Sequence, residues 1–350
     1  MAQAQDVENK ESPNLLVSEV AKKNNDIEII EVSYGYSSVE KSDLTGAIST
    51  VKLEDVIDLP AGNVMQNLQG RVPGLQITTN GNPSSTATVR IRGQGLGPLG
   101  NNDPLYIIDG IPSKSGLHEI NSNDIEDIQV LRDAAAASIY GARSGNGVIV
   151  VTTKKGREGL DFNFRFNQTF EDFDYDLRPL NTAQRAQSVW QAAINDGSNP
   201  DRASALYTFD WNKDYDNPEL YKVILPAFTD PNGVQRPADT DWFNEVTRSS
   251  QVRDLNLSLS GGSDSSRFYT SLGYFNAEGV VDGSKFERIA FRVNSDHDLI
   301  ENKLKVGQTL LVTNQRANLI NDLAGSILGL SIEQQSIVPV YNDAGGWGGP

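Results

Sequence analysis

The second half of the chain is dominated by a two-residue alternation of apolar and polar positions. In residues 161–170 the phenylalanines fall on one side of an extended chain and the polar residues on the other. The same period recurs in four further segments: 255–260, 267–275, 288–296 and 303–312. Such alternation predicts antiparallel strands with one apolar and one polar face. The glycine- and serine-rich segment 261–266 joins two of these strands as a hairpin.

Two architectures accommodate strands of this kind. In a soluble sandwich the apolar face packs on a second sheet, whereas in an outer-membrane barrel it faces lipid and the polar face lines a wet lumen. Strands of about ten residues, as barrels use, small polar residues on the second face and a long polar insertion over 177–252 favour the barrel. A helix is predicted inside that insertion at residues 182–196. The periodicity alone leaves both architectures open.

The segment from residue 44 to 156 has a different pattern, in which short strands alternate with short helical segments and tight turns. Strands are predicted at 46–53, 74–79, 87–93, 105–110, 126–132 and 146–156. A short helix at 61–72 places Val64, Leu68 and Val72 on one face, and Asp133 is the N-cap of a second one at 133–141. These elements predict a small α/β domain.

The glycines at 95, 97 and 100 have the spacing of a dinucleotide-binding fingerprint. That fingerprint must open a helix, because the pyrophosphate binds the free N–H groups of the first helical turn. Pro98 inside the motif and the Asn-Asn-Asp-Pro run after it prevent a helix there. We therefore interpret these glycines as turn residues and reject a nucleotide-dependent enzyme.

The amino-acid composition argues against several classes of protein and of binding site. The formal charge of −16 argues against a nucleic-acid partner, whose phosphates require a basic surface. The absence of cysteine and the presence of only two histidines argue against a clustered metal site. No apolar run approaches the roughly 20 residues of a membrane helix. Residues 1–12 show no secretory signal, which is compatible with a cytosolic protein or with a mature chain.

Five motifs of the α/β segment occur in a recognisable order: VEKSDLTGAISTV, NLQGRVPGLQI, VRIRGQG, PLYIIDGIP and DIEDIQVLRDAAAASIYGARSGNGVIVVTTKKG. Together they resemble the plug of the SusC/RagA-type TonB-dependent outer-membrane receptors of Bacteroidetes. The resemblance implies a small α/β plug domain followed by antiparallel strands of a transmembrane β-barrel. The domains expected are a flexible N-terminal tail (1–26), a TonB-box segment and linker (27–43), the plug (44–156) and the first part of the barrel with long extracellular insertions (157–350). Barrels of this family have about 22 strands, so five or six predicted strands would form an incomplete barrel within a longer receptor.

The resemblance also assigns candidate site residues. The TonB box corresponds to Ile29, Ile30, Glu31, Val32, Ser33 and Tyr34. An extended, β-prone segment can add as a strand to a partner's open sheet edge; the alternative is a first plug strand that only packs. Arg90 and Arg92 share one strand face, and with Arg143 they are expected to pair with barrel-wall carboxylates or, alternatively, to contact substrate.

The function implied is TonB-dependent import of a large nutrient, a glycan or a peptide, across the Gram-negative outer membrane. The implied partners are TonB with ExbB and ExbD, a SusD-like surface lipoprotein and outer-membrane lipid. No cofactor, metal or enzymatic activity is expected. The alternative is a soluble β-rich carbohydrate-binding or adhesion protein with an N-terminal α/β domain.

Overall fold

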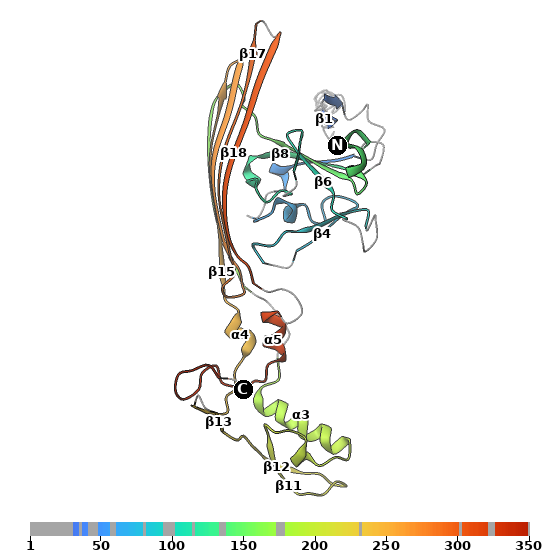
Figure 1. Ribbon diagram of the computed structural model, residues 1–350, viewed down its shortest axis with the longest axis vertical. Helices are drawn as coiled ribbons and strands as arrows, with labels where there is room; N and C mark the ends of the chain where they lie inside the picture. The colour runs from blue at the N-terminus through green and yellow to red at the C-terminus, as the bar shows by residue number, and fades with distance from the viewer. Residues whose placement is uncertain are drawn as a thin grey trace, which may run out of the picture.

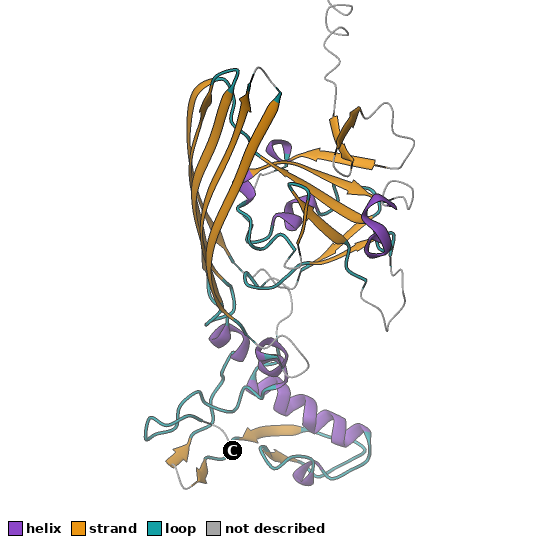
Figure 2. Ribbon diagram, turned by 45° about the horizontal axis from the view of Figure 1, so that its top comes forward, coloured by secondary structure: helices purple, strands orange, loops and turns teal. Residues whose placement is uncertain are grey.

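The computed structural model describes residues 31–34, 37–40, 48–56, 61–79, 82–93, 102–113, 116–132, 138–172, 179–230, 233–300, 303–320 and 326–348. A tall, curved five-stranded sheet forms one side of the molecule, and we call it the wall (Figure 1). The α/β domain, called the plug, packs on the concave face of the wall. A third part, the lobe, extends from one end of the wall. Figure 2 shows the same arrangement after rotation.

The plug is built on a mixed five-stranded sheet. Its strand order is β3 (Ile48–Lys52), β8 (Ile125–Leu131), β9 (Val148–Thr153), β6 (Leu105–Ile108) and β7 (Ile111–Ser113). Only β6 and β9 run parallel within it. A separate hairpin pairs β4 (Leu75–Thr78) with β5 (Thr88–Ile91). Among the described residues of the domain are also four short 3₁₀ helices: η2 (Leu53–Asp55), η3 (Val64–Leu68), η4 (Ser122–Asp124) and η5 (Ser138–Ser144).

The core of the plug explains these elements. Val64 and Leu68 of η3 are buried with Val72, as the predicted helical face requires, although the helix is of the tighter 3₁₀ type. They pack with Ile128 and Val130 of strand β8, which lies between β3 and β9 in the sheet. The second predicted helix lies partly outside the described residues, because residues 133–137 are not described; η5 begins at Ser138.

The wall consists of antiparallel strands whose order across the sheet follows their order along the chain, with most of the lobe inserted between the first two. These are β10 (Gly159–Glu171), β15 (Ser250–Gly262), β16 (Ser266–Glu278), β17 (Lys285–Leu299) and β18 (Leu304–Asn318). They contain 13 to 15 residues, more than the ten expected. The predicted hairpin between β15 and β16 is confirmed.

Burial on the two faces of the wall is the reverse of that in a soluble protein. On the outer face, Phe162 and Phe164 are 63% and 59% exposed, and Phe291 is 40% exposed. On the inner face, Arg288 and Arg292 are only 2% and 1% exposed because the plug covers them. A sandwich would bury the phenylalanines under a second sheet. Apolar side chains outward and polar ones inward are the pattern of a membrane barrel.

The lobe comprises residues 179–230, 233–249 and 326–348. Its helices are α3 (Thr182–Asn195), α4 (Trp242–Val246) and α5 (Ile327–Glu333), with the 3₁₀ helix η6 (Pro200–Arg202). Its strands are β11 (Thr208–Trp211), β12 (Leu220–Ile224), β13 (Phe228–Asp230) and β14 (Gly233–Gln235). Helix α3 confirms the predicted helix; Asn181 and Gln184 close its N-terminus as a capping box. Trp190, Tyr207, Phe209, Trp211 and Ile337 form a separate hydrophobic core.

The two ends of the wall differ. At one end, residues 263–265 join β15 to β16, and β17 ends only five positions before β18 begins; the lobe emerges from the other end (Figure 1). Membrane barrels have short periplasmic turns and longer extracellular loops, so the lobe lies at the end where the extracellular insertions are predicted. Within the described residues, no helix is long and apolar enough to cross a bilayer.

Candidate functional site

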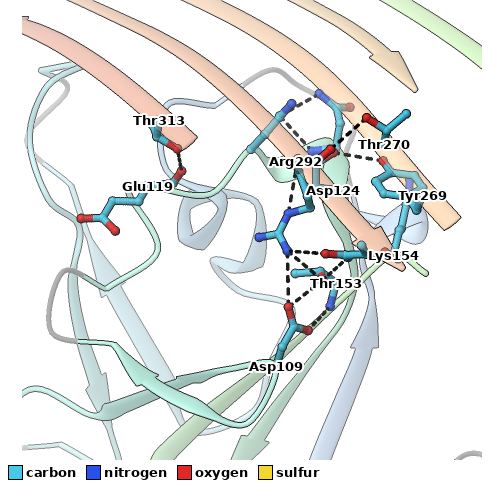
Figure 3. A network of polar contacts seen from close by, with 12 residues as sticks. Asp109, Glu119, Asp124, Thr153, Lys154, Tyr269, Thr270, Arg292 and Thr313 are labelled. Carbon is cyan, nitrogen blue, oxygen red and sulfur yellow. Dashed lines mark hydrogen bonds and ion pairs between the residues drawn. The ribbon is translucent and has the colours of Figure 1, made fainter. Parts of the chain in front are cut away.

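The candidate functional site is the interface between the plug and the inner face of the wall, shown in part in Figure 3. Polar side chains of β15 to β18 reach plug residues that lie more than one hundred residues earlier in the chain. The fold therefore joins two distant parts of the sequence through hydrogen bonds and ion pairs.

Arg292 of β17 is the centre of this interface. Its Nη1 atom donates to Thr153 Oγ1 at 3.0 Å and lies 3.4 Å from Asp109 Oδ2. Its Nε atom lies 3.8 Å from Oδ2 of Asp124, close enough for an ion pair but too far for a hydrogen bond. Asn294, two positions along the same strand face, donates to Thr153 Oγ1 and to the carbonyl of Lys154. One wall arginine thus contacts two plug carboxylates.

Asp109 reaches this position through its backbone conformation. It occupies the tight turn between β6 and β7 with a positive φ of 47°, which aspartate tolerates better than most residues. Its carboxylate accepts hydrogen bonds from the backbone N–H and the hydroxyl of Thr153, at 2.9 and 2.7 Å. The plug's own Thr153 therefore orients the carboxylate that the wall arginine contacts.

Asp124, the last residue of η4, has no exposed surface. Its Oδ1 accepts a hydrogen bond of 3.0 Å from the hydroxyl of Tyr269 on β16. Burial raises the pKa of the Asp124 carboxyl, and the hydrogen bonds and the Arg292 charge counteract this effect. Asn123, its neighbour, donates to Asp254 of β15 at 2.9 Å and accepts from Arg165 of β10 at 3.2 Å.

A second wall arginine binds backbone rather than carboxylates. Arg288 donates to the carbonyl oxygens of Gly62 and His118, at 3.1 and 3.0 Å. Gln315 of β18 donates to the same His118 carbonyl at 2.7 Å, and Thr313 donates to that of Glu119 at 2.9 Å. Burial, followed by the charge of Arg288, lowers the pKa of the His118 imidazole.

The arginines predicted as site residues lie elsewhere on the plug. Arg90 forms an ion pair of 2.6 Å with Asp103, another plug residue. Arg92 ends the β5 strand in a left-handed conformation with φ of 56°, and Arg143 is exposed in η5. None of the three joins the described Arg292 network. Their contacts with barrel carboxylates or substrate stay a prediction.

The ion pairs that Arg292 forms across the interface have the opposite arrangement, with the cation on the wall and the carboxylates on the plug. The signal for the wall residues was present in segment 288–296, where Arg288 and Arg292 share the polar strand face four positions apart. Sequence reasoning did not identify Asp109 or Asp124. Their buried contacts depend on the plug's position against the wall.

The predicted TonB box lies at the beginning of the described chain. Ile29 and Ile30 fall outside the described residues, whereas Glu31–Tyr34 form strand β1, which pairs with β2 (Ser37–Glu40). Strand β1 lies toward the end of the wall that carries the short turns (Figure 1). The hairpin agrees with the β propensity of the segment, and its role stays a prediction.

Comparisons with known proteins agree with this geometry. Residues 40–148 match the family model of the TonB-dependent Receptor Plug Domain. TonB-dependent receptor P26 of Formosa agariphila is 33% identical over 91% of this chain, and TonB-dependent receptor SusC of Bacteroides thetaiotaomicron is 29% identical over 91%. The RagAB peptide importer in its open-open state superimposes with a TM-score of 0.63 at 30% identity, over 85% of this chain and 34% of that one.

The chain belongs to the SusC/RagA-type TonB-dependent receptors. The expected plug, the barrel strands, the link to Bacteroidetes and the outer-membrane location are thereby confirmed. The chain spans 29% of the length of both the P26 and SusC receptors. No group of three or more metal-ligating side chains occurs within the part of this receptor that the structure describes.

Proposed function

We propose that this receptor segment gates the import of a large nutrient, an oligosaccharide or a peptide, across the outer membrane. The observation that carries the proposal is the polar attachment of the plug to the inner face of the wall, centred on Arg292. Hydrogen bonds lost when two polar surfaces separate are replaced by hydrogen bonds to water, so each contributes only about 0.5–1.5 kcal/mol net. Such an interface holds the plug firmly at rest and still permits its displacement.

In the proposed cycle, nutrient binds on the extracellular side, beneath a SusD-like lipoprotein lid. TonB then captures residues 29–34 from the periplasm and, driven by the proton gradient through ExbB and ExbD, pulls on the plug. The position of β1 near the periplasmic end supports this direction of pull. The relative described as a peptide importer supports import of a large molecule. No covalent chemistry is assigned to the chain.

The test is a deletion of residues 29–34 in the native receptor in its own cells. We expect uptake of the nutrient that induces the gene to fall to background, while the amount of receptor in the outer membrane is unchanged. Deletion of residues 3–8, an equally long piece of the polar tail, is the matched control and should leave uptake intact. Normal uptake after deletion of 29–34 would contradict the assignment of the TonB box.

A further inference from the structure

A cavity of about 540 Å³ lies between the plug and the first two wall strands. We call it the cationic cleft, because four basic residues line it: Lys154, Lys155, Arg157 and Arg165. The first three follow β9 of the plug, and Arg165 comes from the inner face of β10. The backbone N–H of Arg157 donates to the Ser260 hydroxyl at the end of β15, so the cleft extends toward the short-turn end of the wall.

The positive charge of the cleft is only partly neutralised. Glu54 and Asp161 are the only carboxylates among its described lining residues. Arg157 approaches Glu126 to 3.7 Å, and both side chains are exposed, so this pair is weak. In the described part of the chain, Lys154 and Arg165 form no ion pair, and Arg165 hydrogen-bonds to the neutral oxygen of Asn123. Burial lowers the pKa of the Lys154 ammonium, as expected for a cation with incomplete compensation.

An uncharged donor at the cleft also lacks a partner. Asn256 of β15 lines the cavity and is 3% exposed, yet its Nδ2 atom has no hydrogen-bond partner among the described residues. Buried donors in folded proteins are nearly always satisfied by protein or by a bound molecule. The cleft therefore combines unpaired cations with an unsatisfied amide.

We propose that the cationic cleft binds an oxyanion, the carboxylate or sulfate group of an acidic nutrient, as the nutrient passes between plug and wall toward the periplasm. Arginine presents paired N–H donors that match the two oxygens of such a group, and lysine adds a compact positive charge. Asn256 and the serines of β15 supply hydrogen bonds for neighbouring hydroxyl groups. A neutral sugar would leave both unpaired cations uncompensated. The claim that the oxyanion belongs to an imported nutrient rests on the proposed import function. The claim that the cleft binds an oxyanion does not.

Binding is tested on the native receptor purified in detergent, by calorimetric titration with glucuronate, inorganic sulfate and glucose. We expect saturable binding of glucuronate and sulfate and none of glucose. Lys154→Met and Arg165→Gln should each weaken binding by about tenfold or more, since a hydrogen bond to a charged group is lost. Lys154→Arg, which keeps the charge, should retain most of the affinity and separates charge loss from misfolding.

The matched control is Arg253→Gln, because Arg253 lies on the outward face of β15 and is exposed. This substitution should change the affinities for glucuronate and for sulfate by no more than about twofold, because the Arg253 charge is screened from the cleft. Absence of saturable binding, or equal weakening by Arg253→Gln, would overturn the site. Binding of glucose as tight as that of glucuronate and sulfate would overturn the assignment to an acidic nutrient. Because no uptake is measured, failure of the import proposal leaves this result unaffected.

Discussion

Arg292 of the wall and Asp124 of the plug lie 3.8 Å apart, Nε to Oδ2, and both side chains are 1% exposed. Asp109 contacts the same guanidinium from the other side, at 3.4 Å. Two plug carboxylates therefore share one wall cation; solvent is excluded from Arg292 and Asp124, whereas the Asp109 side chain is 18% exposed. Removing one partner from such an arrangement leaves a buried charge without compensation.

Arg292→Met should loosen the plug strongly. A broken buried ion pair costs about 3–5 kcal/mol, so we expect a loss of this order in the free energy of unfolding of the purified receptor. Limited proteolysis of the plug should become correspondingly faster. Urea unfolding and the rate of cleavage are the measurements.

The control for this change is Arg267→Met. Arg267 also pairs with a residue that precedes the wall, Glu158 at 3.4 Å, but the two side chains are 46% and 64% exposed. An exposed pair contributes at most about 1 kcal/mol. Equal effects of the two substitutions would show that the buried network does not anchor the plug.

The wall should tolerate charge on one face only. Leu310 on the outer face of β18 is 51% exposed, and its neighbour Thr309 belongs to the inner face. Leu310→Arg should destabilise the membrane-inserted state by about 2–4 kcal/mol, the cost of arginine on a lipid face near the midplane. Thr309→Arg should cost much less because it enters the lumen. The free energy of unfolding in lipid vesicles measures both, and similar losses would contradict the lipid-facing assignment.

Lowering the pH should destabilise the folded plug through protonation of His118. Its pKa is lowered in the folded state, so the unfolded chain takes up a proton first as the pH falls. The stability contributed by the neutral imidazole is therefore complete above the unfolded value of about 6.5 and is lost as the pH falls toward the folded pKa. The melting temperature should fall between pH 7 and pH 5, and less steeply in His118→Gln. An identical pH dependence in the variant would exclude His118 as the cause.

Gly147, in the GARSGNG motif, should be essential to the plug for steric reasons. It has a φ of +90°, and a Cβ added there would lie 2.8 Å from Ile91 Cδ1 and 3.2 Å from the Leu131 carbonyl. Gly70 has a similar φ of +74° but no atom within 4 Å of its added Cβ. Gly70→Ala should therefore cost about 1–2 kcal/mol for the backbone alone, and Gly147→Ala clearly more. Melting temperatures compare the two, and equal shifts would contradict the steric explanation.

Much of this fold follows from local sequence. The alternation in residues 161–170 and 288–296 reports strands with two different faces, and Asn181 with Gln184 marks the beginning of α3. The alternation did not decide which face is buried, because period two is common to sandwiches and barrels. The exposure of Phe162 and the burial of Arg292 show which face is buried. Both follow from the position of the plug on the inner face of the wall.

The site was less accessible to sequence reasoning. Arg90 was expected to reach the wall, yet Asp103, thirteen residues later, lies close enough to pair with it. The partners of Arg292 lie 139 and 183 residues away, at Thr153 and Asp109. Contacts at such separations are determined by tertiary packing. No local pattern encodes them.

The most direct test of plug gating is a disulfide between plug and wall. A Cβ built on Gly273 of β16 lies 3.6 Å from Cβ of Asn121 in the plug, within the range of about 3.5–4.5 Å that a disulfide requires. The chain has no cysteine that could form competing bonds. Asn121→Cys with Gly273→Cys should block nutrient uptake under oxidising conditions, and a reductant should restore it, whereas each single variant transports in both conditions. Undiminished uptake by the fully oxidised pair would show that import does not require the plug to move at this contact with the wall.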